Sequence, residues 1–234
     1  MTFFRSIIIS LITLPVAAVA SAQNDAGVIL RELNNKLSKA KDYTVSANIK
    51  VDIPLIRMLP VDVQIYYKQK GKFRVKSESI AIVPRQGFDQ INMMVADTNA
   101  YVAMVQGEEL MGDVNTKIVN IIPLTDTGEV IFAKFWVDPL QDVVIKSQFT
   151  TRNSGTIVTE YTYGSQLAYG LPDKMVFSID TKKFKLPKNF SPQGTAPAEP
   201  AEADKKKNKD KGMIYITLTN YQVNKGIPDS VFEE

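Results

Sequence analysis

The sequence has 234 residues, with 28 Lys and Arg against 25 Asp and Glu, and it contains neither Cys nor His. These absences exclude disulfides, sulfur-bound zinc, a Ser-His-Asp triad and the usual general base near neutral pH. Apolar residues make up 44% of the chain and the formal net charge is +3, which suits a globular protein and is no nucleic-acid signature.

The first 22 residues have the features of a secretory signal peptide. Arg5 supplies the positive charge, residues 7–18 are mostly apolar, and Ala20-Ser21-Ala22 is a small-residue cleavage site. Cleavage between Ala22 and Gln23 would leave residues 23–234 as a single exported domain. The apolar run is shorter than the ~20 residues that a membrane span needs, so an uncleaved anchor is the less favoured alternative.

An amphipathic helix is predicted over residues 26–40. Asp25 is the expected N-cap, and Ile29, Leu33 and Leu37 recur at four-residue intervals along one side. The apolar stripe is narrow and the polar side carries few lysines, which favours a helix docked on a sheet over one lying on a membrane surface.

Most of the remaining chain alternates apolar and polar residues with the period of antiparallel strands. The first three strands direct one set of side chains to a common face: Ile49, Val51, Ile53, Ile65, Tyr67, Phe73 and Val75. Further strands are predicted at residues 91–95, 101–105, 129–138, 143–152, 156–163, 174–180 and 213–221. Residues 115–122 are predicted as a second helix.

These nine or ten strands are joined by short turns in serial order. We expect an α+β, mostly β fold, in which a strongly curved antiparallel sheet forms an unclosed half-barrel with helices on its concave face. A closed barrel is the alternative. Residues 191–212 are rich in Pro, Ala, Glu and Lys and have little to bury, so they are predicted to be a disordered insertion. A solvated loop is favoured there over a contact with acidic head groups.

No pattern of catalytic residues is found in the sequence. The adjacent carboxylates of Glu108 and Glu109 would point to opposite faces of a strand. Calcium-loop, phosphate-loop and nucleophile-elbow motifs are missing. We therefore expect a protein that is not an enzyme and has no cofactor or metal.

Several strands carry more apolar residues than a sheet with one solvated face needs. Residues 130–137 are apolar on both faces apart from Lys134, and so are residues 93–96. A single helix cannot cover the concave face of ten strands, so loops, a partner or an apolar ligand must fill it. A solvent-open cavity on the order of several hundred Å³ would favour a ligand, whereas a solidly packed face would argue against one.

Five short motifs follow one another in a recognisable order. They are the predicted helix at residues 28–40 leading into Tyr43-Thr44-Val45, the segments Gly71-Lys72-Phe73-Arg74-Val75 and Asp97-Thr98-Asn99-Ala100-Tyr101, the segment Trp136-Val137-Asp138-Pro139, and residues 218–232. This order resembles LolA/LolB-type lipoprotein carriers and the wider family of periplasmic outer-membrane lipoprotein-sorting proteins.

The resemblance implies a periplasmic carrier whose concave face, lidded by helices, shields the acyl chains of a lipid or lipoprotein and carries them towards the outer membrane. It also implies inner- and outer-membrane partner proteins. The family's carriers tether the lid through an Arg before the third strand, and the nearest basic residues here are Lys70 and Arg74. The alternative is a regulatory or structural periplasmic module that binds a protein partner or senses lipoproteins. The inward residues expected to contact acyl chains are Ile29, Leu33, Leu37, Ile49, Val51, Ile53, Ile65, Tyr67, Phe73, Val75, Met93, Trp136 and Phe177.

Overall fold

The computed structural model describes residues 17–54, 58–77, 90–125, 128–153, 155–180 and 211–233, with side chains from residue 25 onward. The helices are α1 (Ala17–Leu37) and α3 (Gln90–Ala96), with short 3₁₀ helices η1 (Leu167–Tyr169) and η2 (Asp229–Phe232). The strands are β1 (Asp42–Asp52), β2 (Val61–Lys68), β3 (Lys72–Lys76), β4 (Tyr101–Met111), β5 (Val114–Pro123), β6 (Val130–Asp138), β7 (Val143–Thr151), β8 (Gly155–Tyr163), β9 (Pro172–Asp180) and β10 (Lys211–Val223).

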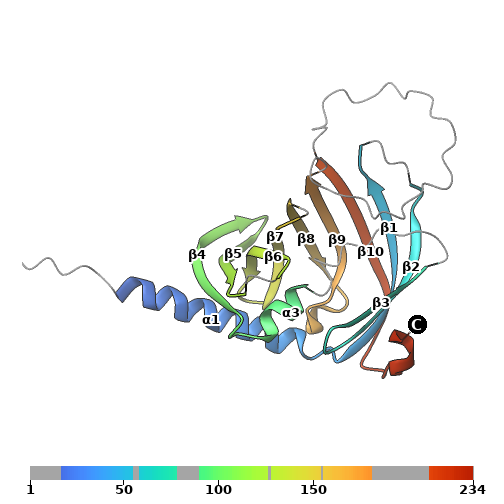
Figure 1. Ribbon diagram of the computed structural model, residues 1–234, viewed down its shortest axis with the longest axis horizontal. Helices are drawn as coiled ribbons and strands as arrows, with labels where there is room; N and C mark the ends of the chain where they lie inside the picture. Colours follow the sequence, from blue (N-terminus) through green and yellow to red (C-terminus); the bar gives the residue numbers. More distant parts are fainter. Residues whose placement is uncertain are drawn as a thin grey trace, which may run out of the picture.

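All ten strands belong to one antiparallel sheet, in the order β3-β2-β1-β10-β9-β8-β7-β6-β5-β4. Neighbours in sequence are neighbours in the sheet except that β1 pairs with β10, which places β3 and β4 at the two edges. Within the described residues no pairing joins these edges, so the sheet is not closed. Figure 1 shows it curving around α1 and α3. The predicted fold class, a mostly β fold with an unclosed curved sheet, is confirmed.

Two predicted elements were of the wrong type. Residues 91–95, expected as a strand, lie in α3, where Ile91 and Val95 are buried four residues apart and Met93 is 55% exposed. Residues 115–122, expected as a helix, form most of β5, which pairs with β4 on one side and β6 on the other. Residues 115–122 form a strand because they pair with a neighbouring strand on each side. Such tertiary contacts outweigh local propensity and short apolar runs.

The limits of other predicted elements also changed. Helix α1 begins upstream of Asp25, which is therefore not an N-cap, and ends at Leu37 instead of residue 40. Lys211 and Gly212 belong to β10, where they pair with β9, and are not part of a disordered insertion. Residues 191–210 of that predicted insertion, and residues 1–16 of the predicted signal peptide, lie outside the described residues.

The strand register shows which face of the sheet is buried. Directly opposed residues share a face, and one such row runs across seven strands from β5 to β1. Every member is at most 7% exposed: Val119, Phe135, Ser147, Thr159, Phe177, Ile214 and Val51. The neighbouring row points to the other face and is mixed: Ile118, Trp136, Lys146, Glu160, Val176, Tyr215 and Lys50. The core therefore lies between the first of these faces, here called the inner face, and the helices.

Trp136, predicted to point inward, lies on the outer face of the sheet. Its Nε1 donates a hydrogen bond to Oε2 of Glu109 at 2.7 Å, and the ammonium groups of Lys134 and Lys146 lie 5.6 and 4.6 Å from its ring centre. The neighbouring Phe135 takes the inward position instead. Because β6 is apolar on both faces and contains two bulges, alternation in the sequence could not assign the face.

Replacing Phe135 by Ala should lower the free energy of unfolding by about 3–5 kcal/mol, because Phe135 is fully buried on the inner face. The control is Leu140→Ala in the β6–β7 turn, where Leu140 is 92% exposed, and it should change stability by less than about 0.5 kcal/mol. Urea unfolding followed by circular dichroism measures both. Similar losses for the two variants would contradict the assigned register.

Candidate apolar binding site

Helices α1 and α3 cover part of the inner face. On α1 the buried residues Ala26, Leu30 and Leu33 follow helical spacing, and on α3 Ile91 and Val95 do the same. Helix α1 packs against β4, β7, α3 and η1. Among the described residues, no backbone hydrogen bond joins either helix to a strand. The helix layer is therefore held on the sheet mainly by apolar side chains.

A small cavity lies between the helix layer and the sheet. Its volume is about 40 Å³, and its lining includes Leu33, Leu37, Ile91, Tyr161, Met175 and Leu218. Pockets that hold small ligands commonly measure roughly 300–1,000 Å³. This cavity is thus too small for an acyl chain in this state, and such a chain could enter it only if the residues that line it moved apart.

Three tyrosines that line this cavity, the buried Tyr161 and the half-buried Tyr163 and Tyr221, have satisfied hydroxyl groups. The hydroxyl of Tyr163 donates to the Val144 carbonyl at 2.8 Å, that of Tyr221 donates to the Pro172 carbonyl at 2.7 Å, and that of Tyr161 lies 2.9 Å from Ser147 Oγ. Burial is the main cause that raises the pKa of all three phenols. They remain neutral hydrogen-bond donors throughout the physiological pH range.

Eleven of the thirteen residues predicted to face acyl chains lie in one apolar cluster. Leu33, Ile49, Val51, Ile53, Ile65, Tyr67 and Phe177 are buried in it, and Ile29, Leu37, Phe73 and Val75 are half-buried against it. Met93 and Trp136 lie outside the cluster. Apolar alternation in the sequence did not single out the cavity residues Tyr161, Met175 and Leu218, although each falls at an inward position of a predicted strand.

The predicted tether residues lie away from the cavity lining. Lys70 is exposed in the β2–β3 turn with a φ of +71°, and Nη1 of Arg74 donates to the Val231 carbonyl in η2 at 2.8 Å. A lysine of α1 makes the polar contact that holds the last turn of this helix on the sheet side. Nζ of Lys36 donates to the Gln141 carbonyl in the β6–β7 turn at 2.5 Å.

The C-terminal segment at residues 224–233, here called the C-terminal clasp, holds the chain just after α1. The side chain of Asn224 accepts from the Lys41 amide at 2.7 Å and donates to the Lys39 carbonyl at 2.9 Å. Oδ1 of Asp42 accepts from the Gly226 amide at 2.9 Å. The C-terminal end of α1 is thereby fixed to the sheet through its connection to β1.

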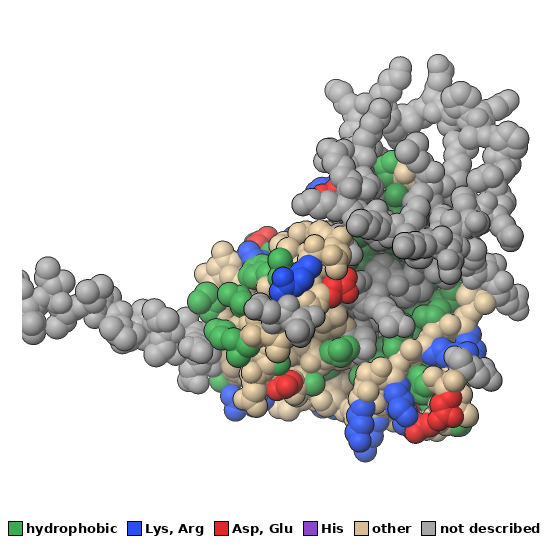
Figure 2. Space-filling view, in the orientation of Figure 1, with side chains coloured by type: hydrophobic (Ala, Val, Ile, Leu, Met, Phe, Trp, Pro, Cys, Tyr) green, Lys and Arg blue, Asp and Glu red, His purple; other side chains and the backbone are tan. Residues whose placement is uncertain are grey.

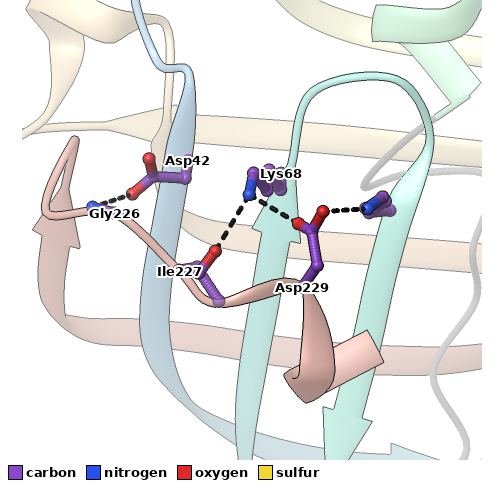
Figure 3. Close-up of polar contacts among 6 residues, drawn as sticks. Asp42, Lys68, Gly226, Ile227 and Asp229 are labelled. Carbon is purple, nitrogen blue, oxygen red and sulfur yellow. Dashed lines mark hydrogen bonds and ion pairs between the residues drawn. The ribbon is translucent and has the colours of Figure 1, made fainter. Parts of the chain in front are cut away.

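The clasp also joins the β2–β3 hairpin (Figure 3). Nζ of Lys68 donates to the Ile227 carbonyl at 3.0 Å and to Asp229 Oδ1 at 2.6 Å, and Lys72 pairs with Oδ2 of Asp229 at 2.9 Å. Hydrogen bonds from these two ammonium groups lower the pKa of the Asp229 carboxyl to about 2. Most of this segment belongs to the last of the five motifs that carry the sequence resemblance, residues 218–232, and these contacts give it a structural role.

Comparison with models of protein families gave no match, and comparison with curated proteins gave none either. Solved structures do match over most of their length. A DUF1329 family protein from Desulfovibrio piger is 11% identical with a TM-score of 0.58, covering 91% of this chain and 98% of that one. A LolA superfamily protein from Nitrosomonas europaea is 13% identical with a TM-score of 0.54, covering 89% and 97%.

The chain has a LolA-like fold. A domain from Vibrio parahaemolyticus, named for outer membrane lipoprotein sorting, agrees with this at 11% identity and a TM-score of 0.55, covering 90% of this chain and 97% of that one. Identities this low show the LolA-like fold alone. In the described part of the chain, no helix combines the length and apolar character of a membrane span.

Replacing Asp229 by Asn should weaken the attachment of the clasp. The folded-state pKa of about 2 lies below the ordinary 3.8, so the carboxylate stabilises the fold above about pH 4 and loses that effect as the pH falls towards 2. The stability difference between the parent protein and Asp229→Asn should therefore be constant near neutral pH and shrink between about pH 4 and pH 2. Thermal unfolding at several pH values measures this difference.

The matched control is Asp113→Asn, which removes an exposed carboxylate in the β4–β5 turn that forms no ion pair within the described residues. High salt should reduce the effect of Asp229→Asn, because the two ion pairs are partly exposed. A stability difference that does not depend on pH would contradict the assigned role of Asp229.

Proposed function

We propose that this protein binds the acyl chains of a lipid or lipoprotein between its helix layer and the inner face of its sheet, without enzymatic chemistry. The observation that carries the proposal is a wide apolar inner face that is partly covered by two helices. Along most of their described length, only side-chain packing holds these helices on the sheet. Such a layer separates from the sheet without breaking a backbone ladder. The LolA-like fold supports the same function.

Because the cavity is too small for an acyl chain, binding would exchange contacts between α1 and the sheet for contacts between the acyl chain and the sheet. The side chains of α1 that cover the sheet, such as Leu30 and Leu33, would leave it as the acyl chain arrives. A sixteen-carbon chain offers on the order of 10 kcal/mol at ~0.8 kcal/mol per methylene before ordering costs. Uncovering a few leucines costs about 1.5–3 kcal/mol each, so the chain can offset their displacement.

The ends of α1 differ in how firmly they are held. Its last turn is fixed by Lys36 and by the clasp contacts to residues 39–42, whereas no polar contact to the sheet is found for residues 25–35 within the described part of the chain. We infer that α1 swings about its C-terminal end and exposes the inner face from its N-terminal end. Release of the ligand would reverse this motion.

The site of action that fits this function is the periplasm. The features of a signal peptide in residues 1–22 support export, and the protein would carry acyl chains towards the outer membrane, receiving and delivering them through inner- and outer-membrane partner proteins.

A protein-binding module is the second candidate, favoured by an exposed apolar area on the outer face. Val102 and Ile122 are opposed across β4 and β5 and are 40% and 51% exposed, and the neighbouring Met104 is 45% exposed. Figure 2 shows hydrophobic side chains gathered over β4 and β5. A regulatory or structural protein that senses lipoproteins could use this surface to contact a protein partner.

Mass spectrometry of organic extracts tests the proposal directly. Protein purified from its native compartment without detergent should carry a lipid or an acylated protein in a reproducible molar ratio, because an occupied inner face is stable in water. Protein denatured, stripped and refolded is the control and should carry none until lipid is added. If native preparations carry no acylated molecule but retain a protein partner, the second candidate is supported and the carrier is not.

Replacing Leu30 by Ala should lower stability and yet strengthen ligand binding. Leu30 is fully buried on α1, so truncating it weakens the docking of the helix on the sheet by about 2–5 kcal/mol. Opening then costs less, and the apparent affinity for a fluorescent fatty acid should rise about tenfold or more. Val28→Ala, on the same helix at a position 45% exposed, is the matched control and should change neither property. Weaker binding by Leu30→Ala would contradict the exchange mechanism.

A further inference from the structure

Two hydroxyl groups interrupt the apolar inner face at its centre. Ser147 on β7 and Thr159 on β8 are directly opposed, and the same row continues into Phe135 on one side and Phe177 on the other. Both hydroxyl-bearing residues are 0% exposed. A buried hydroxyl among apolar groups is destabilising unless it forms hydrogen bonds, so each is expected to have a partner.

Only Ser147 has its partner in this state. Its Oγ lies 2.9 Å from the hydroxyl of Tyr161, which comes from β8 and lines the cavity. Oγ1 of Thr159 has no partner at hydrogen-bonding distance and angle among the described residues, and only a weaker hydrogen-bond interaction with the Tyr161 hydroxyl, which lowers the pKa of that phenol, reaches it. Ser147, Thr159 and Tyr161, here called the hydroxyl cluster, therefore contain one hydroxyl without a full hydrogen bond in a mostly apolar part of the inner face. The other such hydroxyl on this face within the described residues, that of Tyr101, lies on the edge strand β4.

The chemistry of Thr159 specifies what would complete the cluster. A hydrocarbon chain cannot accept a hydrogen bond from the Thr159 hydroxyl, whereas the carbonyl oxygen of an ester or amide can. The apolar residues on both sides of the cluster in the same row would leave the attached chain in an apolar environment. One hydrogen bond at this depth would therefore add discrimination to binding that is otherwise non-directional.

We propose that the hydroxyl cluster binds the ester or amide carbonyl group of the bound molecule through a hydrogen bond, so that the site selects acylated ligands over plain hydrocarbons. This inference rests on the proposed function and names the chemical class that the site takes. The Thr159 hydroxyl donates a hydrogen bond to the carbonyl oxygen. The hydrogen bond between Ser147 and Tyr161 keeps their two hydroxyl groups in place beside it.

Two probes of matched apolar character test the inference: a pyrene-labelled hexadecanoic acid methyl ester and hexadecylpyrene, which lacks the carbonyl. The parent protein should bind the ester about tenfold more tightly than the hydrocarbon. Thr159→Val keeps the shape and removes the hydroxyl, so it should lose this preference while its affinity for hexadecylpyrene stays the same. Its melting temperature without ligand should not fall, because no existing hydrogen bond is lost.

Two further variants keep the test specific. Thr156→Val makes the same change on the outer face of β8, where Oγ1 of Thr156 lies 3.3 Å from Oγ1 of Thr150, and it should retain the preference for the ester. Thr159→Ser restores a hydroxyl and should restore the preference. Equal binding of both probes by the parent protein, or an unchanged preference in Thr159→Val, overturns this inference while leaving the proposed function intact. Failure of the parent protein to bind either probe overturns the proposed function as well.

Discussion

The pairing of β1 with β10 is the constraint on which the rest of this structure depends. It joins Tyr43 to Val223 at one end and Asp52 to Met213 at the other, so the strand after α1 lies beside the strand before the clasp. The opening of the sheet then falls between β3 and β4, the two edges. One ladder thus sets both where the half-barrel stays open and which end of α1 is anchored, because Asn224 meets Lys41 immediately beyond it.

The two faces of the sheet are different environments, and the inner face serves both stability and the proposed binding. Most of the apolar side chains that would shield a ligand there also form the core that stabilises the free protein. A site of this kind cannot be recognised as an empty pocket. It is recognised by how its cover is attached: α1 and α3 contribute buried side chains but no backbone hydrogen bonds to strands among the described residues.

The spacing of apolar residues in the sequence predicted the elements whose apolar residues lie on one face only. Alternation in β1 and helical spacing in α1 placed Ile49 and Leu33 correctly in the core. These patterns failed at Met93, where four adjacent apolar residues fit either a strand or a helix, and at Trp136, where both faces of β6 are apolar. The clasp was beyond reach for another reason: the contact of Asn224 with Lys41 spans 183 residues, and no local pattern specifies which distant segments meet.

The chemistry of the inner face limits how a bound molecule could be released. The sequence contains no His, and burial raises the pKa of Tyr161, Tyr163 and Tyr221 above their usual range. These groups therefore do not change charge near neutral pH, and protonation of the site cannot drive release there. The Asp229 carboxyl also stays ionised until the pH falls towards 2. If the protein binds acyl chains as proposed, their release would then depend on a change in the packing of the helix layer.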